Sequence, residues 1–214
     1  MIYFLASIIA FLVALTIHEF AHAWVANKLG DPNPKISGRL TLNPLAHIDP
    51  IGTIALPLFL FLSGLPVFGW AKPVQVDSYN FRNPRRDLGL VSLAGPGANI
   101  ILAAIFSFIS RIPGFSIGLA SPVANILFFS LIISNLYIAI FNLIPIHPLD
   151  GGKILVGFLP PHLSYKIDGF LSQYGQILLL FLIFPFFGRS LIFTIISPVV
   201  NFFFSIFLPG PSFF

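Results

Sequence analysis

The amino-acid sequence predicts an all-α polytopic membrane protein, a bundle of about five transmembrane spans with one re-entrant segment. The first observation is composition: of 214 residues, 57% are hydrophobic and only 8% are charged. Soluble domains carry about 25% charged residues, so this balance favours an integral membrane protein. The second observation is that the apolar residues fall in long runs between short polar loops. Residues 1–214 are therefore predicted to form a single membrane domain.

The first part of the chain is predicted to contain one span and one re-entrant segment. Residues 2–26 are long enough to cross about 30 Å of hydrocarbon as a helix. Residues 27–50 are polar and rich in turn-forming residues. Residues 51–69 are apolar again but contain helix-breaking residues, namely Gly52, Pro57, Gly64 and Pro66. Such breaks permit a segment to enter the membrane and return, so we predict that residues 51–69 are re-entrant.

The remaining sequence is predicted to contain four further spans. Residues 88–110 and 122–146 form the second and third spans. A short amphipathic connection follows, and the apolar residues 175–208 predict two more spans with a tight turn at 188–190. The domain is thus expected to comprise a core of about residues 1–168 and a C-terminal helical pair at about 175–208.

The first predicted span contains the pattern H-E-x-x-H near its end. On a helix, residues four apart share one face, so His18 and His22 can direct ring nitrogens at one metal ion. Glu19 lies beside them and is able to take a proton from a metal-activated water. This pattern is typical of zinc metalloproteases, and here it falls inside a membrane span.

A catalytic zinc site normally has three protein ligands, so a third must be found. The chain has no cysteine, and Glu19 is its only glutamate, which leaves an aspartate or another histidine. Asp150 lies between Pro148 and two glycines at the end of an apolar run, where a carboxylate is costly unless it has a partner. It would also serve as a helix cap, and taken alone both interpretations fit. The presence of H-E-x-x-H favours the ligand. The other aspartates lie in polar loops and are expected to be solvated: Asp31, Asp49, Asp77, Asp87 and Asp168.

Three motifs together resemble the site-2 protease family of intramembrane zinc metalloproteases. They are H-E-F-A-H in the first span, A-G-P-G-A-N at 94–99, and N-L-I-P-I-H-P-L-D-G-G at 142–152. The similarity covers roughly Phe11 to Lys166. The sequences T-L-N-P-L-A-H-I-D-P-I-G-T and G-W-A-K-P-V also resemble the compact prokaryotic branch without PDZ or CBS domains. We expect the second of these to offer a strand edge to an extended substrate.

The resemblance implies a role for each matching residue. His18, His22 and Asp150 would be the ligands of one Zn²⁺ ion per chain, and Glu19 would be the general base. Asn142 would steady the substrate carbonyl or the oxyanion formed from it. The implied partners are a transmembrane protein or peptide substrate and the lipid bilayer. A transporter, a metal-binding membrane protein or a catalytically inactive homologue remains the alternative, since intramembrane His and Asp residues also build ion pathways.

The proposed ligands also constrain topology. His22 and Asp150 follow the first and third clear spans, and they can share a metal only if residues 51–69 do not cross the membrane. One side then receives nine basic residues: Lys28, Lys35, Arg39, Lys72, Arg82, Arg85, Arg86, Lys153 and Lys166. The other receives Arg111 and Arg189. The basic side is predicted to be cytoplasmic, in the cell (inner) membrane, with the N-terminus outside and the C-terminus inside. Basic residues in short loops are topology signals, so no nucleic-acid partner is expected.

We expect structural roles for most of the remaining histidines and for the motif at 94–99. His147 stands where the family would place proline or another apolar residue, and it would either add a polar contact near the zinc or face the cytosolic rim. His47 is expected to cap a loop or contact headgroups, and His162 to be solvated. Gly95, Gly97 and Asn99 are expected to serve helix packing and interhelical hydrogen bonding, with Asn99 close enough to reach the site.

Overall fold

The computed structural model describes residues 2–64, 69–112, 122–184 and 191–207. Its elements, in chain order, are α1 (Ile2–Lys28), α2 (Asn33–Ile36), η1 (Pro44–Ala46), η2 (Pro50–Ala55), α3 (Leu56–Leu62), η3 (Ser78–Asn80), α4 (Pro84–Ser110), α6 (Pro122–Asn142), α7 (Asp150–Phe158), α8 (Pro161–Ile183) and α9 (Leu191–Phe207). The described residues form helices and loops without a strand. The all-α prediction is confirmed.

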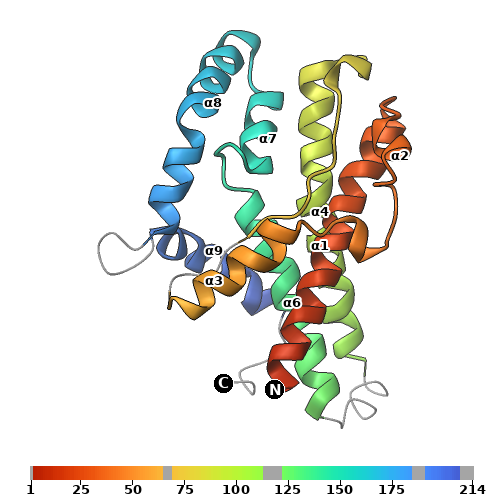
Figure 1. Cartoon of the computed structure of the whole chain (residues 1–214), viewed down its shortest axis with the longest axis vertical. Helices are drawn as coiled ribbons and strands as arrows, with labels where there is room; N and C mark the ends of the chain where they lie inside the picture. The colour runs from red at the N-terminus through yellow and green to blue at the C-terminus, as the bar shows by residue number, and fades with distance from the viewer. Residues whose placement is uncertain (1, 65–68, 113–121, 185–190, 208–214) are drawn as a thin grey trace.

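Three long helices form the core of the molecule (Figure 1). Helices α1 and α6 run in the same direction, α4 runs in the opposite direction, and each of the three packs against the other two. Among the described residues, α1, α4 and α6 are the three helices that are long and apolar enough to cross a membrane, whereas the sequence predicted five spans. They match the first three predicted spans, except that α6 ends at Asn142 because proline follows at position 145.

Small side chains allow these helices to pack closely. Helix α1 buries five alanines, at positions 6, 10, 14, 23 and 26, along its inner face. Helix α4 contributes the buried small residues Gly89, Ser92, Gly95 and Ala103. Small residues let helix backbones approach in a membrane, where apolar burial alone does not favour one helix over lipid. The backbones are thus close enough for short polar side chains to bridge them.

The segment predicted to be re-entrant leaves the core and returns to its starting point. The backbone N–H of Trp70 donates to the carbonyl of Gly52 at 3.1 Å, and the Thr53 hydroxyl donates to the carbonyl of Trp70 at 2.7 Å. Figure 1 shows α3, which lies between these points, crossing in front of the core rather than running along it. The two ends of the segment therefore lie side by side, as re-entry requires, and α1 and α6 end on the same side of the molecule.

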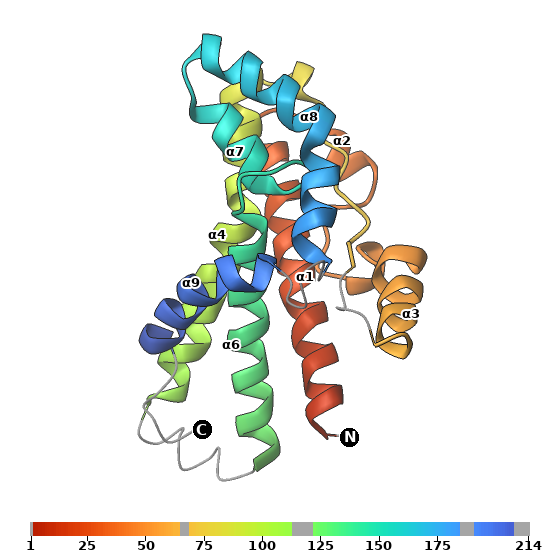
Figure 2. The same ribbon diagram turned by 90° about the vertical axis from the view of Figure 1, so that its left-hand side faces the viewer.

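The C-terminal region differs from the predicted pair of spans. Helix α8 begins at Pro161 and includes the polar connection, while α9 is a shorter apolar helix. The tight turn predicted at 188–190 lies outside the described residues. Figure 2 shows α7 and α8 stacked above α6, with α9 lower down.

The end of α9 lies at the opposite end of the core from Asp150. The side chains of Ser107 and Arg111, at the end of α4, donate to the carbonyls of Phe207 and Ile206 respectively. The predicted topology required the last helix to end on the side of Asp150. The described chain thus ends at Phe207 beside the end of α4, and the predicted cytoplasmic C-terminus falls outside the described residues.

Candidate metal centre

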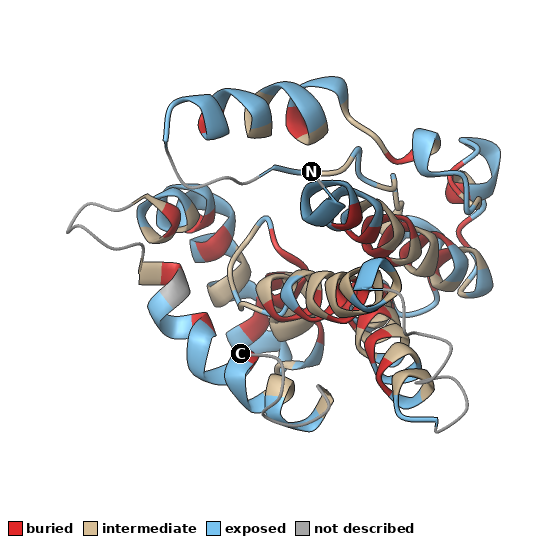
Figure 3. Cartoon of the chain, turned by 90° about the horizontal axis from the view of Figure 1, so that it is seen from below, coloured by how far each residue is buried: buried red, intermediate tan, exposed pale blue. Residues whose placement is uncertain are grey.

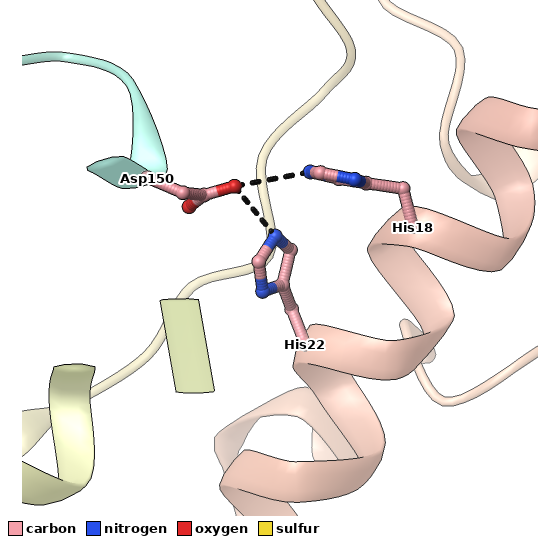
Figure 4. A group of neighbouring side chains, drawn as sticks. All are labelled: His18, His22 and Asp150. Atoms are coloured by element: carbon pink, nitrogen blue, oxygen red, sulfur yellow. Dashed lines mark hydrogen bonds and ion pairs between the residues drawn. The ribbon is translucent and has the colours of Figure 1, made fainter. Parts of the chain in front are cut away.

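His18, His22 and Asp150 come together where α1 meets the start of α7 (Figure 4). The Nε2 atoms of both histidines lie 3.1 Å from the same oxygen, Oδ2 of Asp150. The three potential ligand atoms lie within 4.8 Å of one another, and all three residues are less than 10% exposed. Figure 4 shows both rings pointing from successive turns of α1 toward the carboxylate. The structure thus groups the three residues that the sequence selected as ligands.

Hydrogen bonds at the other ring nitrogens fix the tautomer of each histidine. Nδ1 of His22 lies 2.7 Å from the carbonyl oxygen of Val91, which can only accept, so Nδ1 carries the proton. Nδ1 of His18 lies 2.7 Å from Oδ1 of Asn99. The amide of Asn99 donates at 2.9 Å to the carbonyl of Ala14, which fixes its orientation and leaves Oδ1 as the acceptor. With Nδ1 protonated, each ring in its neutral form presents an unprotonated Nε2 toward Asp150.

This donor set fits a bound cation. In the tautomers just described, two nitrogen lone pairs and a carboxylate oxygen converge in a buried space, and like partial charges repel one another there. A divalent metal ion relieves that repulsion. Histidine Nε2 and aspartate oxygen atoms are ordinary zinc ligands, and hydrogen bonds at Nδ1 orient metal-binding rings in this way.

The hydrogen-bond chain behind His18 extends to a residue that the sequence analysis missed. Asn99 donates its second amide hydrogen to Oδ1 of Asn135 at 2.8 Å, and Asn135 in turn donates to the carbonyl of Leu131. Both asparagines are fully buried, and they join α4 to α6 directly behind the metal centre. The expectation that Asn99 reaches the site is confirmed. An asparagine within an apolar run was the only available signal for Asn135.

Gly95 provides the space for the two imidazole rings. A Cβ atom at this position would lie 2.4 Å from Nε2 of His22 and 2.8 Å from Cε1 of His18. The predicted packing role of Gly95 is therefore confirmed. A Cβ at Gly97 would meet no atom within 4 Å, so Gly97 has no comparable packing role.

Asp150 is the first residue of α7, and a close helix contact holds α7 in place. Leu149 occupies the N-cap position, and no side chain caps the helix there, so Asp150 is not the cap that the sequence allowed. Gly157 of α7 meets Gly89 of α4 so closely that a Cβ at Gly157 would lie 2.8 Å from the Gly89 Cα. From the first turn of α7 the Asp150 carboxylate therefore faces Nε2 of His18 and Nε2 of His22.

Glu19 is also buried, on the side of α1 that faces the returning segment. One of its oxygens, Oε2, accepts a hydrogen bond from the backbone N–H of Val74 at 3.3 Å. This contact connects the predicted base to the extended chain at 69–76. Asn142 lies in the last turn of α6 and is partly buried, and its amide donates to the carbonyl of Ile138 in the same helix. The structure records no hydrogen bond from Asn142 to the metal centre among the described residues.

Some expectations for other polar residues are met and others are corrected. His47 is completely buried and its Nε2 bonds the carbonyl of Thr41 at 2.9 Å, which agrees with the first of its two expected roles, in a loop. Asp31 and Asp87 are also buried rather than solvated. Asp31 accepts from the backbone of Asp77 at 2.8 Å and thereby ties the turn after α1 to the loop before α4. His162 is exposed, as expected.

Comparison with known proteins identifies the family. The family model described as peptidase family M50 matches residues 117–182. The chain is 41% identical over 185 residues to "Putative zinc metalloprotease YwhC" of Bacillus subtilis, with 82% of this chain and 78% of the relative covered. The chain belongs to peptidase family M50. It is also 34% identical over 192 residues to "Putative zinc metalloprotease Rip2" of Mycobacterium tuberculosis, with 88% and 69% covered.

A more distant relative is "Zinc metalloprotease MJ0392" of Methanocaldococcus jannaschii, which is 27% identical over 192 residues, with 89% of this chain and 45% of the relative covered. No solved structure matches the chain. Family membership makes this protein a zinc metalloprotease of the site-2 type, acting on peptide or protein substrates. Its apolar helices make it a membrane protein.

Proposed function

We propose that this M50 protein is an intramembrane endopeptidase that hydrolyses peptide bonds within or near the transmembrane segments of membrane proteins. The observation that carries the proposal is the position of the metal centre. His18, Glu19 and His22 lie on α1, which is long and apolar enough to span a bilayer, and they are buried between it and its neighbours. A substrate would therefore have to meet this site at membrane depth.

His18, His22 and Asp150 would hold one zinc ion per chain. When bound, zinc supplies a Lewis acid that polarises the scissile carbonyl and lowers the pKa of water. Glu19, beside the ligands, takes the proton of the attacking water and passes it to the leaving nitrogen. Its buried carboxylate has the backbone N–H of Val74 to orient it. Asn142, near the end of α6, would donate its amide to the substrate carbonyl after leaving its own helix carbonyl.

A transmembrane helix must unwind before its peptide bonds can be attacked, because its amides are bonded within the helix. The extended segment at 69–76 is suited to hold such an unwound substrate. Its backbone amides at Trp70, Lys72 and Val74 donate toward the protein at alternate positions. The amides of Ala71 and Gln75 make no hydrogen bond in the described structure, so they offer an edge for strand pairing.

The charge pattern supports an orientation in the cell membrane. Nine of the eleven basic residues belong to the segment from the end of α1 to the start of α4 or to α7 and α8, and we propose that this side of the protein is cytoplasmic. The metal centre would then lie toward the cytoplasmic leaflet, and the N-terminus outside. Because α9 ends beside Arg111, the described chain would end toward the outside as well.

The test is cleavage of a single-span reporter by the purified protein in liposomes. We expect mass spectrometry to place the cut within or next to the span, a chelator to stop cleavage, and zinc to restore it. Cleavage of unfolded soluble peptides alone would contradict the intramembrane proposal. Zinc binding without any cleavage would identify an inactive homologue. Metal flux across the liposome membrane would identify a transporter.

A further inference from the structure

The pair formed by His147 and Asp168 lies outside the metal centre and has no part in the mechanism above. Nε2 of His147 donates to Oδ1 of Asp168 at 2.9 Å. The histidine side chain is 16% exposed and the aspartate side chain 49% exposed. His147 belongs to the loop between α6 and α7, and Asp168 belongs to α8. The bond therefore ties the loop that leads to Asp150 to a separate helix.

His147 also packs against both helices that follow it. A Cβ atom at Gly152, in the first turn of α7, would lie 2.6 Å from Nδ1 of His147. A Cβ atom at Gly175 of α8 would lie 2.4 Å from the backbone oxygen of His147. Neither glycine leaves room for a side chain. The imidazole thus rests on the turn that presents Asp150, and the His147 backbone rests on α8.

Asp150 is consequently supported from two sides. Its carboxylate faces His18 and His22 on α1, as Figure 4 shows, while the turn that carries it rests on His147. No side chain caps the N-terminus of α7, so the direction of its first turn depends on packing. Outer groups that orient a metal ligand typically contribute about 10- to 100-fold in metal affinity. The pair is placed to make such a contribution.

We propose that His147 and Asp168 are positioning residues that fix the Asp150 carboxylate for metal binding. The proposal rests on the metal centre of the proposed function, but not on what the enzyme cleaves. His147 orients the turn by direct contact, and Asp168 holds the imidazole in the orientation that makes this contact. Asp168 needs only to accept a hydrogen bond from Nε2 of His147, and its side chain is half exposed.

The test compares zinc dissociation constants, measured by competition with a chelator, in the full-length protein. H147A and D168L remove the bond, and we expect each to weaken zinc binding about 10- to 100-fold. D168N keeps an oxygen acceptor and should bind zinc as the wild type does. H162A, which removes an exposed histidine just before Asp168 in the chain, is the matched control and should have no effect. The double variant H147A/D168L should be no weaker than H147A alone.

A second readout separates positioning from general damage. At saturating zinc, kcat should return close to the wild-type value in D168L, with KM unchanged throughout. If H147A does not fold, D168L and D168N still provide the comparison because Asp168 is partly exposed. Equal zinc affinity in D168L, H162A and the wild type would overturn the proposal, and so would equal losses in D168N and D168L. A wild type that binds zinc but cleaves no membrane substrate would refute the proposed function and leave this comparison intact.

Discussion

The core around the metal centre and the segment at 50–76 are built in opposite ways. In the core, α1, α4 and α6 contact one another extensively, and buried polar groups such as Asn99 and Asn135 are hydrogen-bonded. Helix α3 contacts mainly η2, and Leu60 is its only buried residue. Figure 3 shows the same contrast, with buried residues concentrated where the long helices face one another.

The difference shows how one small membrane domain combines a rigidly held metal site with access for a substrate. Metal ligands must be held to within a fraction of an ångström, which close packing and outer hydrogen bonds provide. A substrate can enter only where part of the protein opens, and elements with few buried contacts open at the lowest free-energy cost. We therefore expect substitutions in the core to change zinc affinity or kcat, and substitutions in the 50–76 segment to change KM.

The largest effect is expected from removing a metal ligand. Asp150→Ala takes away the only carboxylate in the ligand group, so we expect loss of bound zinc and of detectable cleavage. Metal analysis of the purified variant measures the first effect, and a reporter assay in liposomes the second. Zinc content equal to that of the wild type would show that Asp150 is not a ligand.

The next largest effect is expected at the end of α6. If Asn142 stabilises the oxyanion, Asn142→Ala should lower kcat about 100- to 1,000-fold, the usual cost of removing one such donor. Zinc content should stay the same, because Asn142 bonds only its own helix in the described structure. An unchanged kcat would remove Asn142 from the mechanism.

A smaller effect, on zinc affinity, is expected from crowding the imidazoles. Gly95→Ala places a methyl group 2.4 Å from Nε2 of His22, so a ring must shift and zinc should bind about 10- to 100-fold more weakly. Gly97→Ala is the matched control in the same helix, since its methyl group meets nothing within 4 Å. Equal zinc affinities in the two variants would show that the core tolerates movement at the site.

The smallest effect is expected in the 50–76 segment. Gly52→Ala places a methyl group 2.2 Å from the Trp70 indole, which must move and take the extended chain with it. We expect a rise in KM with zinc content unchanged, and a fall in kcat only to the extent that Val74, whose N–H orients Glu19, moves as well. Gly169→Ala, in an open position on α8, serves as the control. A fall in zinc affinity in Gly52→Ala would mean that the two regions are not separable.

The sequence predicted that His18, His22 and Asp150 lie together because each step depended on local information. Helical periodicity alone places His18 and His22 on one face, and the absence of cysteine and of a second glutamate left few candidates for the third ligand. The return of residues 51–69 was predictable because a shared metal requires His22 and Asp150 to lie on the same side. The structure brings the three proposed ligands together and places the ends of the 51–69 segment side by side.

What the sequence did not reveal depends on long-range contacts. Hydropathy showed that residues 175–208 are apolar, but not that α8 starts earlier or that α9 ends beside Arg111. Asn135 is a polar residue in an apolar helix, which predicts a partner without saying which one. Asp31 was expected to be solvated, because its hydrogen-bond partners lie almost fifty residues further along the chain and local sequence does not reveal them.

The central claim is that Glu19 acts as the base beside a zinc ion held by His18, His22 and Asp150. Glu19→Gln tests it most directly, because the side chain keeps its size and loses only its ability to accept a proton. Zinc content and reporter cleavage should be measured on the same preparation. The account predicts the wild-type zinc content with no cleavage. Cleavage at the wild-type rate by the zinc-loaded variant would contradict it.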